Sequence, residues 1–520
     1  MNYAELFRVT LPETTLEVAA LVVLVVDLVV LRKAELKTRA LVAALLGVAG
    51  CGAGYWAMQA QGSAAADGLS FHATGELLLA TGGFAAVAQI GILVLTALTL
   101  LLLVGSDFTH HVGEYTAVVL MAATGGLLVA AAQDLLVIFL GLELLSLGLY
   151  ILTAFAKRSG KSAEAALKYY LFGGTAAAFL LFGFSYLYGI AGSTNLQQIM
   201  QSMNGGNAFH AAPLLYIALV MIAAGLGFKV AAVPFHLWAP DTYEGAPAPA
   251  AAFIASVSKV ASFALLISIG TAAWHVFNAA HPAQLAMGAV QPHTAQEPAY
   301  QGFQVPWTLI LVILSVASMT LGNLAALVQI SVRRLVAYSA IAHAGYILLA
   351  LAYFSSTPLS ANAVLYYILT YGLTTVGAFG VVAVVERAAG SDRMDAFLGL
   401  HKRNPLLAAV LLVLFLSLAG IPPLVGFWAK FNLFAAVLAV SAGPVPFTLV
   451  ALAVLMSAVS LYYYLQVLKR AYVMPAVEET AIEAHPVTKA VLVAIAAAVL
   501  LLGCFPGLLE SWIQSFTLMH

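Results

Sequence analysis

Apolar runs of roughly 20 residues recur from one end of the sequence to the other, and a helix of that length can cross a bilayer. We place fourteen of them near residues 12–31, 40–59, 77–104, 114–133, 134–156, 167–191, 212–237, 247–272, 306–328, 333–354, 361–386, 405–439, 446–468 and 487–508. Only 8% of the residues are charged, whereas soluble domains carry about 25%. The sequence therefore predicts an all-α polytopic membrane protein with about 14 transmembrane helices.

The basic residues indicate how these helices are oriented. If the N-terminus lies outside, every second loop is cytoplasmic, and 17 of the 21 Lys and Arg residues fall in those loops. Such an excess is typical of cytoplasmic loops. Of the other four, Arg8 precedes the first run, and Lys229, Lys259 and Lys430 lie inside runs. We therefore expect both termini on the external side.

Two of the runs, 212–237 and 405–439, are interrupted by proline and lie five runs apart, so they have opposite orientations. Lys229 and Lys430 each lie within about two turns of such a break, at the 3.6 residues per turn of a helix. Paired interrupted helices are typical of inverted repeats in transporters, with the working site at mid-membrane. The pattern predicts two inverted five-helix repeats, each with a broken helix and a wet cavity beside its lysine. The simpler alternative is that proline is common in membrane helices.

We expect one transmembrane domain, residues 1–520, in four parts. These are N-terminal helices at 12–104, a first repeat at about 114–272, a second repeat at about 306–468 and a final helix at 487–508. Residues 192–211 are expected to hold a short interfacial helix, and residues 275–304 an external polar loop.

Four ionisable residues, Glu143, Lys229, Lys259 and Lys430, lie well inside apolar runs. A lysine at the centre of a membrane helix costs about 3 kcal/mol on insertion scales, so a function has to compensate for it. Glu143 needs a nearby cation to stay charged, and Lys229 is its expected partner. The alternative is a static ion pair that joins helices, but it leaves Lys259 and Lys430 unexplained. We interpret the four as a site that gains and loses protons.

Two histidines are candidate proton relays. His343 lies mid-run with Ser339 and Tyr346 on the same helix face, and a histidine titrates near neutrality; a hydrogen-bonded core histidine is the alternative. His236 lies at the cytoplasmic end of the first broken helix, with Asp241 and Glu244 after it. That cluster is either a proton uptake route or a helix end cap.

For the remaining polar residues we expect structural or solvent-exposed roles. Ser256, Ser258, Ser262, Asn323 and Gln329 are expected to hold water beside the lysines. Lys168 is expected to extend to the membrane surface, Glu13, Glu17 and Asp27 to be interfacial, and Asp134 to be solvated.

Several classes of function are excluded. The net charge of −1 gives no basis for nucleic-acid binding. The two cysteines cannot form a four-thiolate iron–sulfur site, and His110-His111 lacks a third ligand at metal spacing. No glycine-rich phosphate loop, flavin fingerprint or nicotinamide fingerprint is present. We therefore expect no cofactor and no metal in this chain.

With these residues identified, the chain resembles the antiporter-like membrane subunits of respiratory complex I, the NADH–quinone oxidoreductase, and most closely the subunit N family. The similarity covers residues 139–152, 162–183, 227–264, 333–351 and 416–434. The third and fifth stretches, which include GFKVAAVPFHLWAPDTYEGAPAP and LAGIPPLVGFWAKFNLF, are specific to this superfamily. Lys430 stands where subunit M has a glutamate, and the opening Leu11-Pro12-Glu13 also resembles subunit N. The subunits of multisubunit sodium/proton antiporters share this core and are the main alternative.

The resemblance implies a proton-translocating subunit of the bacterial inner membrane, in which Glu143, Lys229, Lys259 and Lys430 form the proton axis. Its expected partners are the other membrane-arm subunits of complex I. NAD, FMN, iron–sulfur clusters and quinone are expected in other subunits, so this chain alone should oxidise nothing. A scaffold that only joins subunits would not need three buried lysines.

Overall fold

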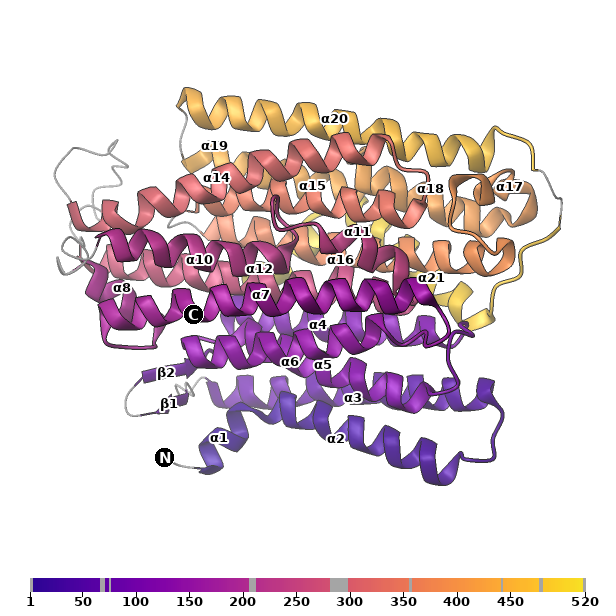
Figure 1. Cartoon of the computed structure of the whole chain (residues 1–520), viewed down its shortest axis with the longest axis horizontal. Coiled ribbons are helices and arrows are strands. Elements are labelled where there is room, and N and C mark those ends of the chain that lie inside the picture. Colours follow the sequence, from indigo (N-terminus) through magenta and orange to yellow (C-terminus); the bar gives the residue numbers. More distant parts are fainter. Residues whose placement is uncertain are drawn as a thin grey trace.

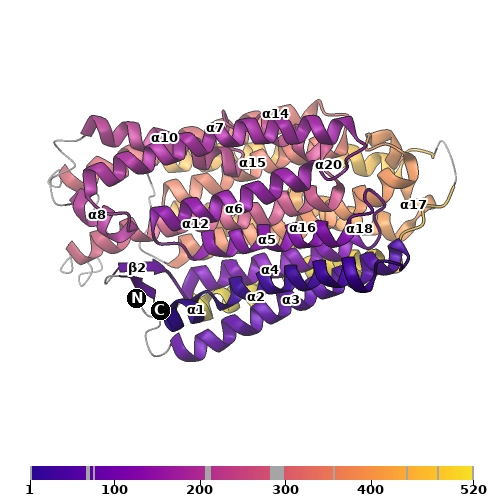
Figure 2. The same ribbon diagram turned by 60° about the horizontal axis from the view of Figure 1, so that its bottom comes forward.

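The computed structural model describes residues 3–65, 71–73, 76–204, 212–280, 298–354, 358–440, 443–476 and 480–517. Its long helices lie side by side along one direction, with α17 at one end of the bundle and α8 and the β1–β2 hairpin at the other (Figure 1). The same arrangement holds in the rotated view (Figure 2). We call the end that contains α17 the basic end, because the loops predicted to be cytoplasmic meet there.

The elements follow the predicted order closely. They are α1 Tyr3–Val9, α2 Leu11–Val25, the π-helix η1 Val26–Val30, α3 Leu36–Ala65, β1 Phe71–Ala73, β2 Glu76–Leu79, α4 Gly83–Leu103, α5 Val112–Ala131, α6 Leu135–Thr153, α7 Gly160–Ala191, α8 Leu196–Asn204, α10 Ala212–Val230, α11 Trp238–Gly245, α12 Ala248–Ala280, α14 Pro298–Leu327, α15 Val332–Ala352, α16 Pro358–Ala389, η2 Met394–Phe397, α17 Leu400–Arg403, α18 Pro405–Ala419, α19 Val425–Val440, α20 Pro444–Tyr472, α21 Pro486–Cys504 and α22 Gly507–Thr517.

The all-α membrane fold is confirmed. Among the described residues, 12 helices are long and apolar enough to cross a membrane. The first predicted run is divided between α2 and η1, and the run at 405–439 is divided between the shorter apolar helices α18 and α19. Together these segments account for the fourteen predicted spans.

Three predicted boundaries differ from the structure. The run at 77–104 begins in strand β2, which pairs antiparallel with β1, and its helix starts at Gly83. Helix α12 extends to Ala280 and α14 starts at Pro298, so the two ends of the predicted loop at 275–304 are helical, and residues 281–297 lie outside the described part. The interfacial helix predicted within 192–211 is α8.

The two repeats pack their first helix pairs in the same way. A Cβ added at Gly125 of α5 would lie 2.4 Å from the backbone nitrogen of Leu145 in α6, and one at Gly322 of α14 would lie 2.6 Å from that of Ala342 in α15. Each residue of the second pair comes 197 positions after its counterpart in the first. Small residues let membrane helices approach closely, and the common spacing identifies equivalent positions in the two repeats.

The α14–α15 contact gives a prediction about stability. A Cβ at Gly345 would lie 2.5 Å from the backbone nitrogen of Met319, and backbone atoms cannot move aside as a flexible side chain can. We expect Gly345→Ala to destabilise the protein by about 1–3 kcal/mol through overpacking, measured as a lower thermal unfolding temperature of the purified assembly. Gly174→Ala is the matched control, because nothing lies within 4 Å of its added Cβ. Equal unfolding temperatures for the two variants would contradict the packing argument.

Each broken helix has its freed polar groups satisfied by protein. After α10 ends, the Val233 amide donates to Ser318 Oγ, and Trp238 Nε1 donates to the carbonyl of Phe228 at 2.9 Å. Between α18 and α19, Gly420 adopts φ +88°, and the Gly426 amide donates to Ser417 Oγ. Side chains from neighbouring segments make these hydrogen bonds, and the wet cavity beside each lysine stays a prediction.

Candidate functional site

The three predicted lysines all lie inside the bundle. Lys229 in α10, Lys259 in α12 and Lys430 in α19 are 7%, 3% and 6% exposed. Each ammonium nitrogen also lies within 6 Å of the centre of an aromatic ring, a distance at which a cation is attracted to the ring face. The amines therefore face protein groups and not lipid.

Lys229 is held by a serine rather than by the expected glutamate. It lies in the last turn of α10, where the negative end of the helix dipole favours a cation. Its Nζ donates to Ser146 Oγ, which donates to the carbonyl of Leu142. Glu143 is half-buried and interacts with Lys229 electrostatically, without an ion pair in the described structure. The partnership expected for Glu143 and Lys229 is thus electrostatic, and Ser146, almost one turn further along α6, accepts the hydrogen bond from the amine.

Lys259 lies on α12, the most deeply buried of the long helices. Its Nζ donates to the carbonyl of Ala340 in α15 at 2.5 Å and lies 5.5 Å from the ring centre of Tyr371 in α16. No carboxylate pairs with this amine among the described residues. Because a low-dielectric interior disfavours a charge that lacks a counter-ion, Lys259 is suited to release a proton.

Lys430 caps the end of a helix. Its Nζ donates to the carbonyls of Leu418 and Ala419 at 3.0 and 2.9 Å and to Ser457 Oγ at 2.8 Å. The last carbonyls of a helix have no partner within the helix, and the helix dipole favours a positive charge there. The break thus exposes the last carbonyls of α18, and Lys430, which lies on the following helix α19, binds them.

His343 in α15 lies between Lys259 and Lys430. Its Nδ1 shares a hydrogen bond of 2.6 Å with the hydroxyl of Tyr367. Its ring lies 4.9 Å from that of Tyr371, which Lys259 contacts, and 5.8 Å from that of Tyr346, which Lys430 contacts. His343 also interacts electrostatically with both amines. The structure brings these three predicted residues together.

Two tyrosines beside His343 were not among the predicted site residues. Tyr367 and Tyr371 come from α16, and their only signal was that they stand four residues apart inside an apolar run. Asn323 donates to the hydroxyl of Tyr346 and accepts from that of Tyr463, so it supports the tyrosines and bonds no lysine. Ser256 and Ser262 bond backbone carbonyls of their own helix, and Gln329 bonds that of Ala325.

The repeat relates His343 to Ser146. The spacing of 197 residues that aligns the two helix pairs also aligns these two positions. In the first repeat Ser146 accepts a hydrogen bond from Lys229, and in the second His343 stands between two lysines. The repeats therefore place a polar side chain at the same point of the fold, but only the second of these side chains can titrate near neutrality.

The predicted cluster of His236, Asp241 and Glu244 does not form one group, because the two carboxylates belong to an ion-pair network and the histidine does not. Asp241 pairs with Lys168 and Arg334, both at 2.7 Å, and Glu244 pairs with Lys161 and Arg334, both at 3.0 Å. Burial by itself would raise the pKa of each carboxyl group, but these hydrogen bonds lower both below their ordinary values. His236 is buried apart from them, and its Nδ1 has no partner in the described residues. Lys168, which we expected to extend to the membrane surface, takes part in this network through its ion pair with Asp241.

Three acidic residues that we expected at the membrane surface or in solvent are buried. Asp27 accepts two hydrogen bonds from Arg39 at 2.8 and 2.7 Å. Glu13 accepts one from Gln89 at 3.2 Å. Asp134 caps the start of α6. The expectation of a solvated Asp134 was wrong, because Thr194 in the segment after α7 donates to it and it is 3% exposed. For Glu13 and Asp27 the interfacial position stays a prediction, and partners from α3 and α4 bury both side chains.

Comparisons with known proteins agree with this architecture. The profile of the family described as "NADH:quinone oxidoreductase/Mrp antiporter, TM" matches residues 132–291 and 294–460. The chain is 45% identical to NADH-quinone oxidoreductase subunit N 2 of Acidobacterium capsulatum, over 99% of both chains. It is 41% identical to subunit N 1 of Roseiflexus castenholzii, over 84% of this chain and 79% of that one.

Solved structures share the fold. A chain of respiratory complex I from Thermus thermophilus with bound aureothin is 32% identical, with a TM-score of 0.73 over 96% of this chain and 98% of that one. A chain of the Mrp complex from Dietzia sp. is 21% identical, with a TM-score of 0.74 over 97% and 99%. At that level of identity the second similarity shows the fold alone.

Proposed function

Because this chain belongs to the subunit N family of NADH-quinone oxidoreductases, we propose that Glu143, Lys229, Lys259 and Lys430 carry protons across the membrane in it. In this proposal quinone reduction elsewhere in the complex drives the transfer. The main support is His343, which stands between the aromatic rings that Lys259 and Lys430 contact. The three amines are buried, and Lys259 in particular caps no helix end and has no carboxylate partner among the described residues.

The proposed direction runs from the basic end to the opposite end. The basic end is cytoplasmic in this proposal, since Lys and Arg concentrate on that side of membrane proteins, and both termini are then periplasmic in a bacterial inner membrane. A change in the interaction between Glu143 and Lys229 alters the proton affinity of Lys259. The proton then passes by way of His343 to Lys430 and leaves on the far side.

The cost of moving a proton against the membrane potential is similar to the cost of a charged lysine in the membrane interior. Moving one elementary charge against 100 mV costs about 2.3 kcal/mol, and placing a charged lysine in the membrane interior costs about 3 kcal/mol on insertion scales. A modest change in the surroundings of one amine is therefore enough to drive a proton against the membrane potential. NAD, FMN, the iron–sulfur clusters and quinone belong to other subunits in this proposal, so this chain contributes the proton path and contacts with the membrane arm.

Glu143→Ala tests the function directly. The variant removes the carboxylate that acts on Lys229, so we expect normal assembly but proton pumping reduced by roughly tenfold, the effect of a change of about one pKa unit at the amine. Pumping per NADH oxidised, measured in membrane vesicles, is the readout. Glu164→Ala removes an exposed carboxylate at the basic end and serves as the control. Normal proton-to-electron stoichiometry in Glu143→Ala would refute the proposal.

A further inference from the structure

A cavity of about 410 Å³ opens at the basic end, above the helix that carries Lys259. Its walls come from α4, α12 and α16 and from the loops that join the helices at this end. Ala248, the first residue of α12, lines it, and Lys259 lies 11 residues further along, about 16 Å deeper at 1.5 Å per residue. The cavity therefore faces the site from the proposed cytoplasmic side.

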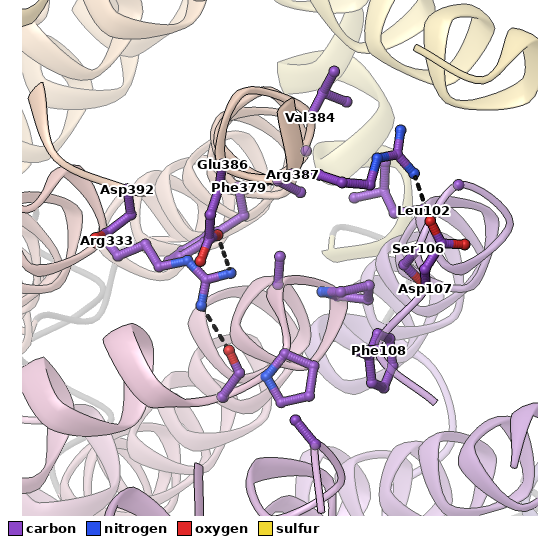
Figure 3. A pocket seen from close by; sticks show the side chains of 18 of the residues that line it. Leu102, Ser106, Asp107, Phe108, Arg333, Phe379, Val384, Glu386, Arg387 and Asp392 are labelled. Carbon is purple, nitrogen blue, oxygen red and sulfur yellow. Dashed lines mark hydrogen bonds and ion pairs between the residues drawn. The ribbon is translucent and has the colours of Figure 1, made fainter. Parts of the chain in front are cut away.

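Charged groups surround the mouth of this cavity (Figure 3). Glu386 and Arg333 form an ion pair of 2.6 Å on one wall, and Arg387 and Asp107 approach to 3.8 Å on another. Arg333 also donates to the carbonyls of Glu244 and Ala246, so it is fixed where α11 meets α12. The charged groups that act on Glu386 are Arg333, Asp392 and Lys161. Its side chain is 34% exposed, so it can exchange protons with water.

Two tyrosines connect the inner wall of the cavity to Lys259. Phe379 of α16 lines the cavity, and the ring of Tyr243 in α11 lies 5.7 Å from it. Tyr243 interacts electrostatically with Tyr371, and the Tyr371 ring lies 5.5 Å from the Lys259 amine. Tyr371 precedes Phe379 by eight residues on α16, about 12 Å at 1.5 Å per residue, so the two tyrosines lie between the cavity wall and the lysine.

The hydroxyl groups of Tyr243 and Tyr371 are buried and have no hydrogen-bond partner among the described residues. Thr375, one turn from Tyr371, is committed to a backbone carbonyl. An unsatisfied buried hydroxyl costs about 1–3 kcal/mol, and ordered water commonly satisfies such groups. These two hydroxyl groups lie one after the other between a polar cavity and a buried amine. We infer that water molecules bridge the gaps between them.

We propose that this cavity is the proton uptake path to Lys259, with Glu386 as the group that collects the proton and Tyr243 and Tyr371 as relays. The inference rests on the proposed function and adds residues to it. The Glu386 carboxylate takes a proton from cytoplasmic water and releases it to water in the cavity. Tyr243 and then Tyr371 each pass on a hydroxyl proton and receive another, so neither changes overall. The Lys259 amine becomes an ammonium ion. Glu244 lines this cavity, whereas His236 and Asp241 do not.

The test measures proton pumping and NADH oxidation by the whole complex in vesicles. We expect Glu386→Gln, Tyr243→Phe and Tyr371→Phe to lower pumping by roughly 100-fold, because each removes a positioned proton-transfer group. Glu164→Gln, at an exposed carboxylate of the same end, and Tyr366→Phe, at a buried hydroxyl of the same helix that also lacks a partner in the described residues, should pump normally.

Small weak acids separate proton delivery from a structural role. Formate or azide, which can carry a proton into the cavity, should restore pumping in Glu386→Gln but not in Lys259→Ala. Normal pumping in Glu386→Gln and Tyr371→Phe, or a loss in Glu386→Gln that neither acid restores, would overturn the uptake path. Normal pumping in Lys259→Ala would instead overturn the proposed function, so the two failures can be told apart.

Discussion

Replacing Lys259 by methionine is expected to reduce proton pumping by at least about 100-fold, the lower bound for loss of a proton-transfer group that acts in series, while the complex still assembles. Methionine keeps most of the side-chain volume in α12, where the neighbours are tightly packed. The amine that bonds Ala340 is lost, and the path between the basic end and His343 is interrupted. Vesicle pumping and the amount of assembled complex are the two measurements.

Lys259→Arg separates proton transfer from charge. A guanidinium keeps the positive charge and can still donate to Ala340, but it does not release a proton in proteins. We therefore expect Lys259→Arg to be as defective as Lys259→Met. Lys33→Met is the control, since that side chain is exposed in a basic loop away from the site. If the arginine variant pumped normally, Lys259 would be an electrostatic residue and not a carrier.

Replacing Lys430 is expected to have a comparable effect on pumping and an additional effect on stability. Lys430→Met leaves the carbonyls of Leu418 and Ala419 without their donor, and an unsatisfied buried acceptor costs about 1–3 kcal/mol. Lys430→Glu should be less stable still, because a carboxylate would face those carbonyls at the negative end of the α18 dipole. We expect the thermal unfolding temperature to fall from the wild type to Lys430→Met and again to Lys430→Glu. Measuring these three temperatures tests the geometry of the second break.

That comparison has a clear negative outcome. If Lys430→Glu were as stable as the wild type and pumped normally, the amine would not be the cap of α18, and a carboxylate could replace it. If Lys430→Met lost stability but kept its pumping, Lys430 would be structural and the last step of the proton path would need another residue.

Sequence patterns were sufficient for the helices and for the burial of the lysines. The length of each apolar run, the alternation of basic loops and the two proline breaks are local properties, and they predicted the spans that the structure contains. They did not predict the β1–β2 hairpin, since most of β2 belongs to the apolar run at 77–104 and the hairpin is held by backbone hydrogen bonds to residues 131–133 at the end of α5.

Hydrogen-bond partners were much harder to predict. Glu143 was expected to hold Lys229, but Ser146, 83 residues away in the sequence, takes that position. Lys259 was expected among water and its own serines, but a carbonyl of α15 and a ring of α16 surround it. A helix face can be deduced from spacing, whereas the helix that will cover it cannot.

Residue types alone indicated that three amines lie inside apolar helices and that two helices break, because the cost of charge in hydrocarbon and the missing proline donor do not depend on the fold. The hydrogen bonds of each amine, the position of His343 between Lys259 and Lys430, and the cavity that points toward Lys259 became known from the packed helices. Those relations depend on the distance between segments that the chain brings together only when the helices have packed.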